Sequence, residues 1–195
     1  MNEHKELLSK WLRVLFYIQI ASIAITFVNA VSNLDSITRW VSKGLSLATI
    51  WSLFQMNTVQ PRYRTTAILS TVVFICGLLT LPVNRSGIGL STVLLLVGST
   101  CSWVAAYQEY HGHSEVAACW DPQLGRKWNN LFVLEIVSGL AVSFLTTIVT
   151  TVLMAADAPS KLPTTVTIVI STSVGLVMKL LYLHYMKQTL SLVEA

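Results

Sequence analysis

The sequence predicts an all-α fold: a single integral membrane domain over residues 1–195, built as a bundle of six transmembrane helices. Composition is the first reason. Hydrophobic residues make up 53% of the chain and charged residues 11%, whereas a soluble domain carries about 25% charged residues. The second reason is that the apolar residues fall into runs of about 20, the length of helix that crosses the hydrocarbon core of a bilayer. The lipid bilayer is therefore the expected surrounding of this chain.

The first two runs differ in how well they suit a membrane. Residues 11–31 follow a basic, polar start and are too long for the apolar core of a cleaved signal peptide, so we expect a transmembrane helix. Residues 37–56 reach spanning length only by including Arg39 and Lys43. These two side chains lie one helical turn apart, so both could extend to the same interface. A spanning helix is the prediction, and a helix lying in the interface is the alternative.

The other four runs are separated by residues typical of turns, such as the Asn-Arg-Ser-Gly segment at 84–87. The predicted helices are 65–83, 88–107, 122–155 and 164–186. Asp121 and Pro122 form a start signal for the helix at 122–155, with Asp121 as the N-cap and Pro122 at the first helical position.

The distribution of Lys and Arg predicts the topology. With six spans and the N-terminus inside, nine of the 13 basic residues lie inside and four outside, in agreement with the positive-inside rule. If residues 37–56 did not span, five would lie inside and eight outside. The sequence therefore predicts a multi-pass protein of the cell membrane with both termini in the cytoplasm. The polar segment 107–130 would then form a short cytoplasmic hairpin between the fourth and fifth helices.

The predicted hairpin carries candidate metal ligands. His111 and His113 flank Gly112, which permits a turned backbone on which the two imidazoles could converge. Cys119 and Asp121 would complete a four-ligand set of a kind that zinc accepts. Zinc is the cofactor that this hypothesis implies.

The alternative is a solvated cytoplasmic segment without a cofactor. If its first half continues the fourth helix, Glu109 and His113, like His111 and Glu115, are acid–histidine pairs four residues apart that stabilise a helix. The histidine motif is short and has no second pair with the spacing of metal ligands. The sequence therefore favours this alternative over a metal site.

Two charged residues inside the hydrophobic runs are the strongest candidates for a functional site. Glu135 and Lys179 each lie about 10–12 Å inside the cytoplasmic end of antiparallel helices, so we expect them at similar depth. Buried membrane charges normally pair with each other or face a cavity. Small residues at spacings of four accompany both, namely Gly139, Ser143 and Thr147 beside Glu135, and Gly175 and Ser171 beside Lys179. Such stripes let helices approach closely, which predicts a Glu135–Lys179 contact.

Gln19 of the first helix lies at similar depth and extends this predicted polar site. The favoured function is a small transporter, channel or membrane sensor that acts on a small ion or small molecule; homo-oligomers are compatible with it. A membrane-embedded metal enzyme using His111 and His113 is one alternative, and a non-catalytic accessory subunit is another, but enzymatic activity is not the expectation. Basic residues flank the apolar runs instead of clustering, which argues against nucleic-acid binding.

Overall fold

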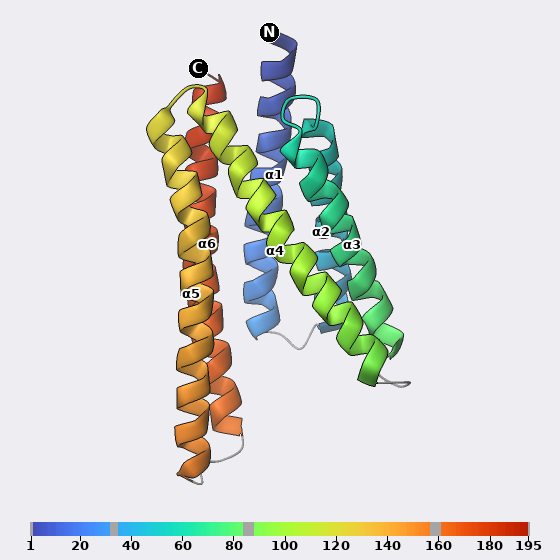
Figure 1. Ribbon diagram of the computed structural model, residues 1–195, viewed down its shortest axis with the longest axis vertical. Helices are drawn as coiled ribbons and strands as arrows, with labels where there is room; N and C mark the ends of the chain where they lie inside the picture. The colour runs from blue at the N-terminus through green and yellow to red at the C-terminus, as the bar shows by residue number, and fades with distance from the viewer. Residues whose placement is uncertain (1, 32–34, 84–87, 157–160, 195) are drawn as a thin grey trace.

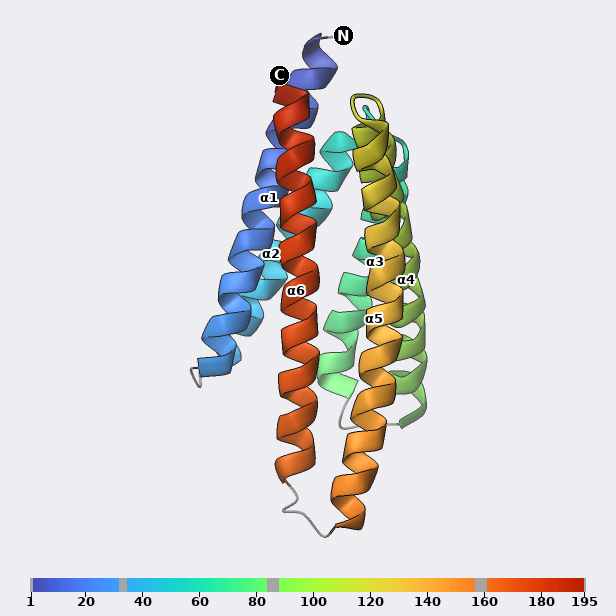
Figure 2. The same ribbon diagram turned by 90° about the vertical axis from the view of Figure 1, so that its left-hand side faces the viewer.

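The computed structural model describes residues 2–31, 35–83, 88–156 and 161–194, and within these ranges the chain forms six α-helices (Figure 1). They are α1 (Asn2–Val31), α2 (Asp35–Met56), α3 (Arg62–Val83), α4 (Ile88–Ala118), α5 (Pro122–Ala155) and α6 (Lys161–Glu194). The helices alternate in direction, so the start of α1, the end of α6 and the α2–α3 and α4–α5 turns lie at one end, here called the terminal end (Figures 1 and 2). The fold class is all-α, as predicted.

Three helices extend beyond the predicted bounds by eight residues or more. α1 begins nine residues before residue 11, α4 continues from residue 107 to Ala118, and α6 continues from residue 186 to Glu194. All three extensions lie at the terminal end. The apolar run marks where a bilayer would end, whereas a helix ends where its backbone is capped and its side chains stop packing. These polar extensions pack against one another and therefore stay helical.

In the part of the chain that the structure describes, five helices are long and apolar enough to cross a membrane: α1, α3, α4, α5 and α6. The helix outside this group is α2, the one that carries Arg39 and Lys43. It is nevertheless a regular helix of 22 residues that packs between α1 and α3.

The described helices form a closed ring. Each contacts the next along the chain, α6 contacts α1, and α4 also touches α6 across the ring. Near the termini the ring is fastened by Glu194, whose carboxylate accepts hydrogen bonds from Arg13 and Ser9. The first and last helices are therefore neighbours in the same way as helices that follow each other in sequence.

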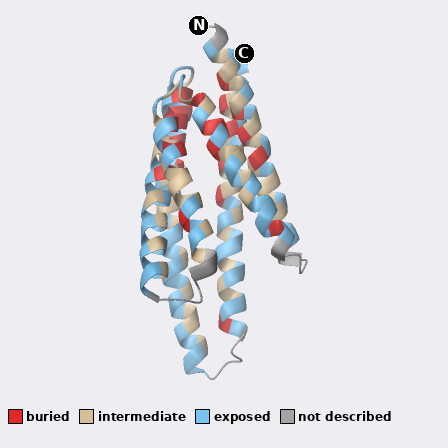
Figure 3. Cartoon of the chain, turned by 90° about the vertical axis from the view of Figure 1, so that its right-hand side faces the viewer, coloured by how far each residue is buried: buried red, intermediate tan, exposed pale blue. Residues whose placement is uncertain are grey.

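The packed core is concentrated in the terminal half of the bundle (Figure 3). Its largest fully buried side chains include Trp128, Tyr63, Leu12, Leu53 and Met186. Large apolar side chains elsewhere on the helices point outward, with Phe144 and Leu140 of α5 exposed by 71% and 67%. Such a surface needs an apolar surrounding, which agrees with helices of membrane-spanning character.

The polar segment 107–130 is not a hairpin loop but the ends of two helices joined by a three-residue turn, residues 119–121. Asp121 caps α5 by accepting a hydrogen bond from the Gln123 N–H at 2.8 Å, with Pro122 in the first turn, as the start signal predicted. The helices meet closely at Gly125, where an added Cβ would lie 2.8 Å from the Ala118 Cβ. The Ser114 hydroxyl donates to the Gly125 carbonyl across this contact.

Candidate functional site

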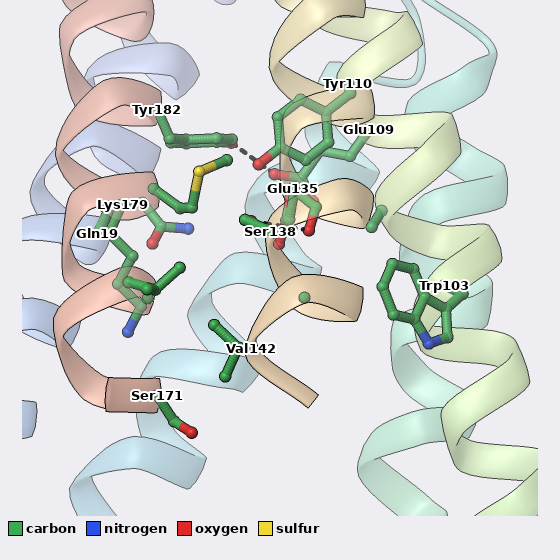
Figure 4. A pocket seen from close by; sticks show the side chains of 15 residues that line it. Gln19, Trp103, Glu109, Tyr110, Glu135, Ser138, Val142, Ser171, Lys179 and Tyr182 are labelled. Atoms are coloured by element: carbon green, nitrogen blue, oxygen red, sulfur yellow. Dashed lines mark hydrogen bonds between the residues drawn. The ribbon is translucent and has the colours of Figure 1, made fainter. Parts of the chain in front are cut away.

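A cavity of about 450 Å³ lies between α1, α4, α5 and α6. Apolar side chains such as Val142 and Met178 line it. Polar side chains line it as well, and polar groups are rare inside a membrane bundle. The polar lining residues are Gln19, Glu109, Tyr110, Glu135, Ser138, Ser171, Lys179 and Tyr182 (Figure 4). We call this space the polar cavity.

The structure brings Gln19, Glu135 and Lys179 to this one cavity, from α1, α5 and α6 respectively. Gln19 and Lys179 lie on one side of it, and Glu135 lies on the other together with Glu109 of α4 (Figure 4). The cavity therefore has an acidic wall formed by α4 and α5 and a basic wall formed by α1 and α6.

The direct contact predicted between Glu135 and Lys179 is absent, since no ion pair joins these two described residues. The Lys179 ammonium group donates instead to the Ser22 hydroxyl of α1, at 3.3 Å. The Glu135 Oε2 atom is buried and has no hydrogen-bond partner among the described residues. Helix direction brings the two charges to the same depth, but the rotation of the helices about their axes places the cavity between them.

The small-residue stripes also differ from the prediction. A Cβ added to Gly139 would first meet the Trp103 ring at 4.0 Å, and one added to Gly175 would meet no atom of the described chain within 4 Å. α5 and α6 are neighbours, but these glycines do not mediate close packing between them. Both line the polar cavity, so their lack of a side chain adds to its volume.

A hydrogen-bonded chain of side chains borders the cavity at the terminal end. His113 is 1% exposed, and its Nδ1 and Nε2 atoms lie 2.9 Å from the hydroxyls of Tyr63 and Tyr182. The Tyr182 hydroxyl donates to Glu109 Oε1 at 2.5 Å. A hydroxyl has one proton, so Tyr182 must accept from Nε2–H of His113, and in a neutral imidazole Nδ1 accepts from Tyr63. The chain thus joins α3, α4 and α6 and fixes the orientation of Glu109.

Aromatic rings pack around His113. The Trp128 ring lies 4.7 Å from the imidazole and 5.1 Å from the Tyr182 ring, measured between centroids. The Trp128 indole donates to the Thr189 hydroxyl at 3.0 Å, which satisfies its buried N–H. His113 therefore has a packed, hydrogen-bonded position, and the expectation that it is solvated is wrong.

The four candidate metal ligands do not come together. On the helix, His111 points to a different face from His113, as expected for residues two apart; its Nδ1 lies 3.1 Å from the Tyr107 carbonyl and its ring stacks on Tyr107. Cys119 donates to the Glu115 carbonyl, and Asp121 caps α5. Among the described residues, no group of three or more His, Cys, Asp or Glu side chains is placed to hold a metal ion.

The polar cavity is lined by further polar residues that the sequence did not single out. Glu109 was noted for its spacing from His113, but its place on the cavity wall depends on Tyr182, which is 73 residues away. Tyr110, beside Glu135, is a neighbour of Glu109 on α4. The signal available in the sequence was the adjacent pair Glu109 and Tyr110, which begins two residues past the predicted end of the fourth helix.

Compared with known proteins, the chain matches no protein family, no curated protein and no solved structure. The chemistry of the site therefore has to be inferred from its own residues. Opposite charges on facing walls of a cavity, within helices of membrane-spanning character, can bind a polar or charged ligand that lipid would exclude.

Proposed function

We propose that this protein binds a small ion or small polar molecule in the polar cavity and acts as a transporter, channel or sensor in the membrane. The observation that carries the proposal is the separation of Glu135 from Lys179 across the cavity. Charges at this depth are costly unless they are paired or serve a function. Since no ion pair joins these two residues, a charged or polar ligand in the cavity can compensate both of them.

The proposed topology has six spans, with α2 as the least apolar, and both termini in the cytoplasm of a multi-pass cell-membrane protein. Two observations support it. Nine of the basic residues would lie inside and four outside. The first turn of α1 and the last turn of α6 lie at the same end of the bundle, as an even number of spans requires. The cavity would then open toward the cytoplasmic half of the membrane.

Accessibility of the cavity to water tests the proposal. Cys76, Cys101 and Cys119 would first be replaced by Ser, and Ser138→Cys would then be introduced on the cavity wall. Leu140→Cys is the matched control, because Leu140 lies two residues away on the same helix and is exposed on the outer surface. Both variants would be treated in membrane vesicles with a charged, membrane-impermeant thiol reagent.

We expect the Ser138→Cys thiol to react at least tenfold faster than the Leu140→Cys thiol, because thiolates form in water and not in lipid. Reaction from both faces of the membrane would favour a transporter or channel, and reaction from one face a sensor. Equal, slow reaction of both thiols would overturn the proposal, because a cavity closed to water cannot admit a polar ligand.

A further inference from the structure

We infer that the ligand of the polar cavity is a small zwitterion, whose cationic ammonium group binds at the acidic wall and whose anionic oxygens bind at the basic wall. This inference rests on the proposed function and names its ligand class. It follows from the chemistry of each wall and from the failure of the two walls to neutralise each other.

The acidic wall fits an ammonium group. The Glu135 Oε2 atom is buried and lacks a hydrogen-bond partner among the described residues, and a buried carboxylate oxygen without a donor is strongly unfavourable. Glu109 is held on the same wall by Tyr182. The Tyr110 and Trp103 rings line the same region, and aromatic faces attract ammonium groups.

The basic wall fits an anionic group. Among the described residues, the Lys179 ammonium group donates to Ser22 alone, at the long distance of 3.3 Å. An ammonium group has three N–H donors, so others remain for a ligand. The Gln19 side chain lines the cavity on the same side and adds an amide. A carboxylate or phosphate at this wall would receive hydrogen bonds from both side chains.

A ligand with a single charge satisfies one wall and leaves the other uncompensated. A bound cation would leave Lys179 without an anion, and a bound anion would leave Glu135 without a cation. A zwitterion compensates both at once, and its net charge of zero does not disturb the membrane potential. The volume of about 450 Å³ falls in the range of small-molecule sites, about 300–1,000 Å³.

The inference is tested by ligand-dependent thermal unfolding of the full chain in nanodiscs of phosphatidylglycerol, whose headgroup carries no cationic group. The soluble probes are γ-aminobutyrate and phosphoethanolamine as zwitterions, with butylamine and butyrate as single-charge analogues. A ligand that binds the folded state alone stabilises it by RT ln(1 + [L]/Kd), so Tm rises with ligand concentration. We expect a zwitterion at millimolar concentration to raise Tm by about 2–4 °C or more, and the single-charge analogues to raise it by less than a quarter of that.

Variants then assign the two walls. Glu135→Gln should remove the shift with zwitterions, and Lys179→Met should remove it while allowing butylamine to stabilise the protein. Lys187→Met is the matched control, because Lys187 is exposed on the same helix, outside the cavity, and should leave the shift unchanged. If a cavity variant fails to fold, the comparison of zwitterions with single-charge probes on the unmodified protein still decides the matter.

The same chemistry occurs in a lipid headgroup, so a second arm replaces phosphatidylglycerol by phosphatidylethanolamine or phosphatidylcholine. A stabilisation by phosphatidylethanolamine that depends on Glu135 and Lys179 supports the inference with lipid as the source. Equal stabilisation by butylamine and zwitterions would overturn it while leaving the proposed ligand site intact. The inference would also be overturned if no probe and no lipid produced a shift in Tm that depends on Glu135 or Lys179. The reactivity of Ser138→Cys would then show whether the proposed function also fails.

Discussion

His113 joins three helices through one imidazole ring. Both of its nitrogens are hydrogen-bonded to tyrosine hydroxyls, from α3 and α6, and Trp128 of α5 packs on its face. A buried polar group with all its partners specifies one arrangement of its neighbours, because any other arrangement leaves donors or acceptors unsatisfied. The side chain that looked most like a metal ligand in the sequence therefore has a structural position.

Replacing His113 should destabilise the protein, whereas replacing His111 should not. His113→Ala removes two buried hydrogen bonds, leaves the Tyr63 hydroxyl unpaired and opens a cavity beside Trp128, for an expected loss of about 2–4 kcal/mol. His111→Ala removes a half-buried ring from the surface, with an expected change within about 0.5 kcal/mol. Denaturant unfolding in detergent measures both changes. Equal effects of the two substitutions would contradict the placement of His113.

The effects of Glu135→Gln and Lys179→Met on stability should be additive. The two side chains lie on opposite walls of the cavity without an ion pair, and residues without shared partners add within about 0.3–0.5 kcal/mol. A double-mutant cycle in ligand-free detergent is the measurement. A coupling free energy above about 1 kcal/mol would mean that the two charges touch, and the cavity between them would then be closed in solution.

The residues of the cavity show how far the sequence could predict the site. The sequence predicts Gln19, Glu135 and Lys179 at similar depth, because distance along a helix and alternating helix direction follow from it, and the three residues line one cavity. Whether two residues at one depth touch depends on how each helix is rotated and how far apart the axes lie. Neither quantity is encoded locally. The sequence therefore could not show that Glu135 and Lys179 are not in contact, or that Tyr182 bonds to Glu109.

The α4–α5 turn combines a capped helix start at Asp121 with a close helix contact at Gly125. Its start signal, Asp121 and Pro122, was readable because a cap depends on residues two or three positions apart. The extension of α4 through His111 and His113 lies beyond the end predicted at residue 107, because hydropathy records only the apolar run. The spacing of four between Glu109 and His113 was the sign that the helix could continue. Among the described glycines the closest approach is at Gly125, in the first turn of α5, whereas the sequence pattern favoured Gly139 and Gly175.

Gly125→Ala should be strongly destabilising and Gly175→Ala should not. The added methyl group at Gly125 would lie 2.8 Å from the Ala118 Cβ and 2.9 Å from the Ser114 carbonyl oxygen, so α4 and α5 would have to separate. We expect a loss of about 1–3 kcal/mol. Gly175→Ala meets no described atom within 4 Å and should stabilise the helix by up to about 1 kcal/mol. Thermal unfolding of both variants is the measurement, and an unchanged Tm for Gly125→Ala would contradict the close approach.

At the scale of the molecule, the six-span topology makes a direct prediction. Exposed positions at the terminal end, His4, Ala118 and Ser191, should all be labelled from the cytoplasmic side after substitution by Cys in a cysteine-free background. Met154, exposed near the far end of α5, should be labelled from the outside. Labelling of Ala118→Cys from the outside would mean that α2 does not cross the membrane and lies in the interface.

The closed ring of helices has a consequence for the order in which the chain can be made. Because α6 contacts α1 as α2 contacts α3, a circular permutant in which a linker joins residue 195 to residue 1, with new ends in the α2–α3 turn, would keep every helix beside its present neighbours. Arg62 and Arg64 would then lie in the first turn of the first helix to be synthesised and hold it in its original orientation. We expect this permutant to insert and to unfold within a few degrees of the natural chain, as measured by its Tm in detergent. Assembly of the bundle would thus depend on which helices are neighbours and not on which is translated first.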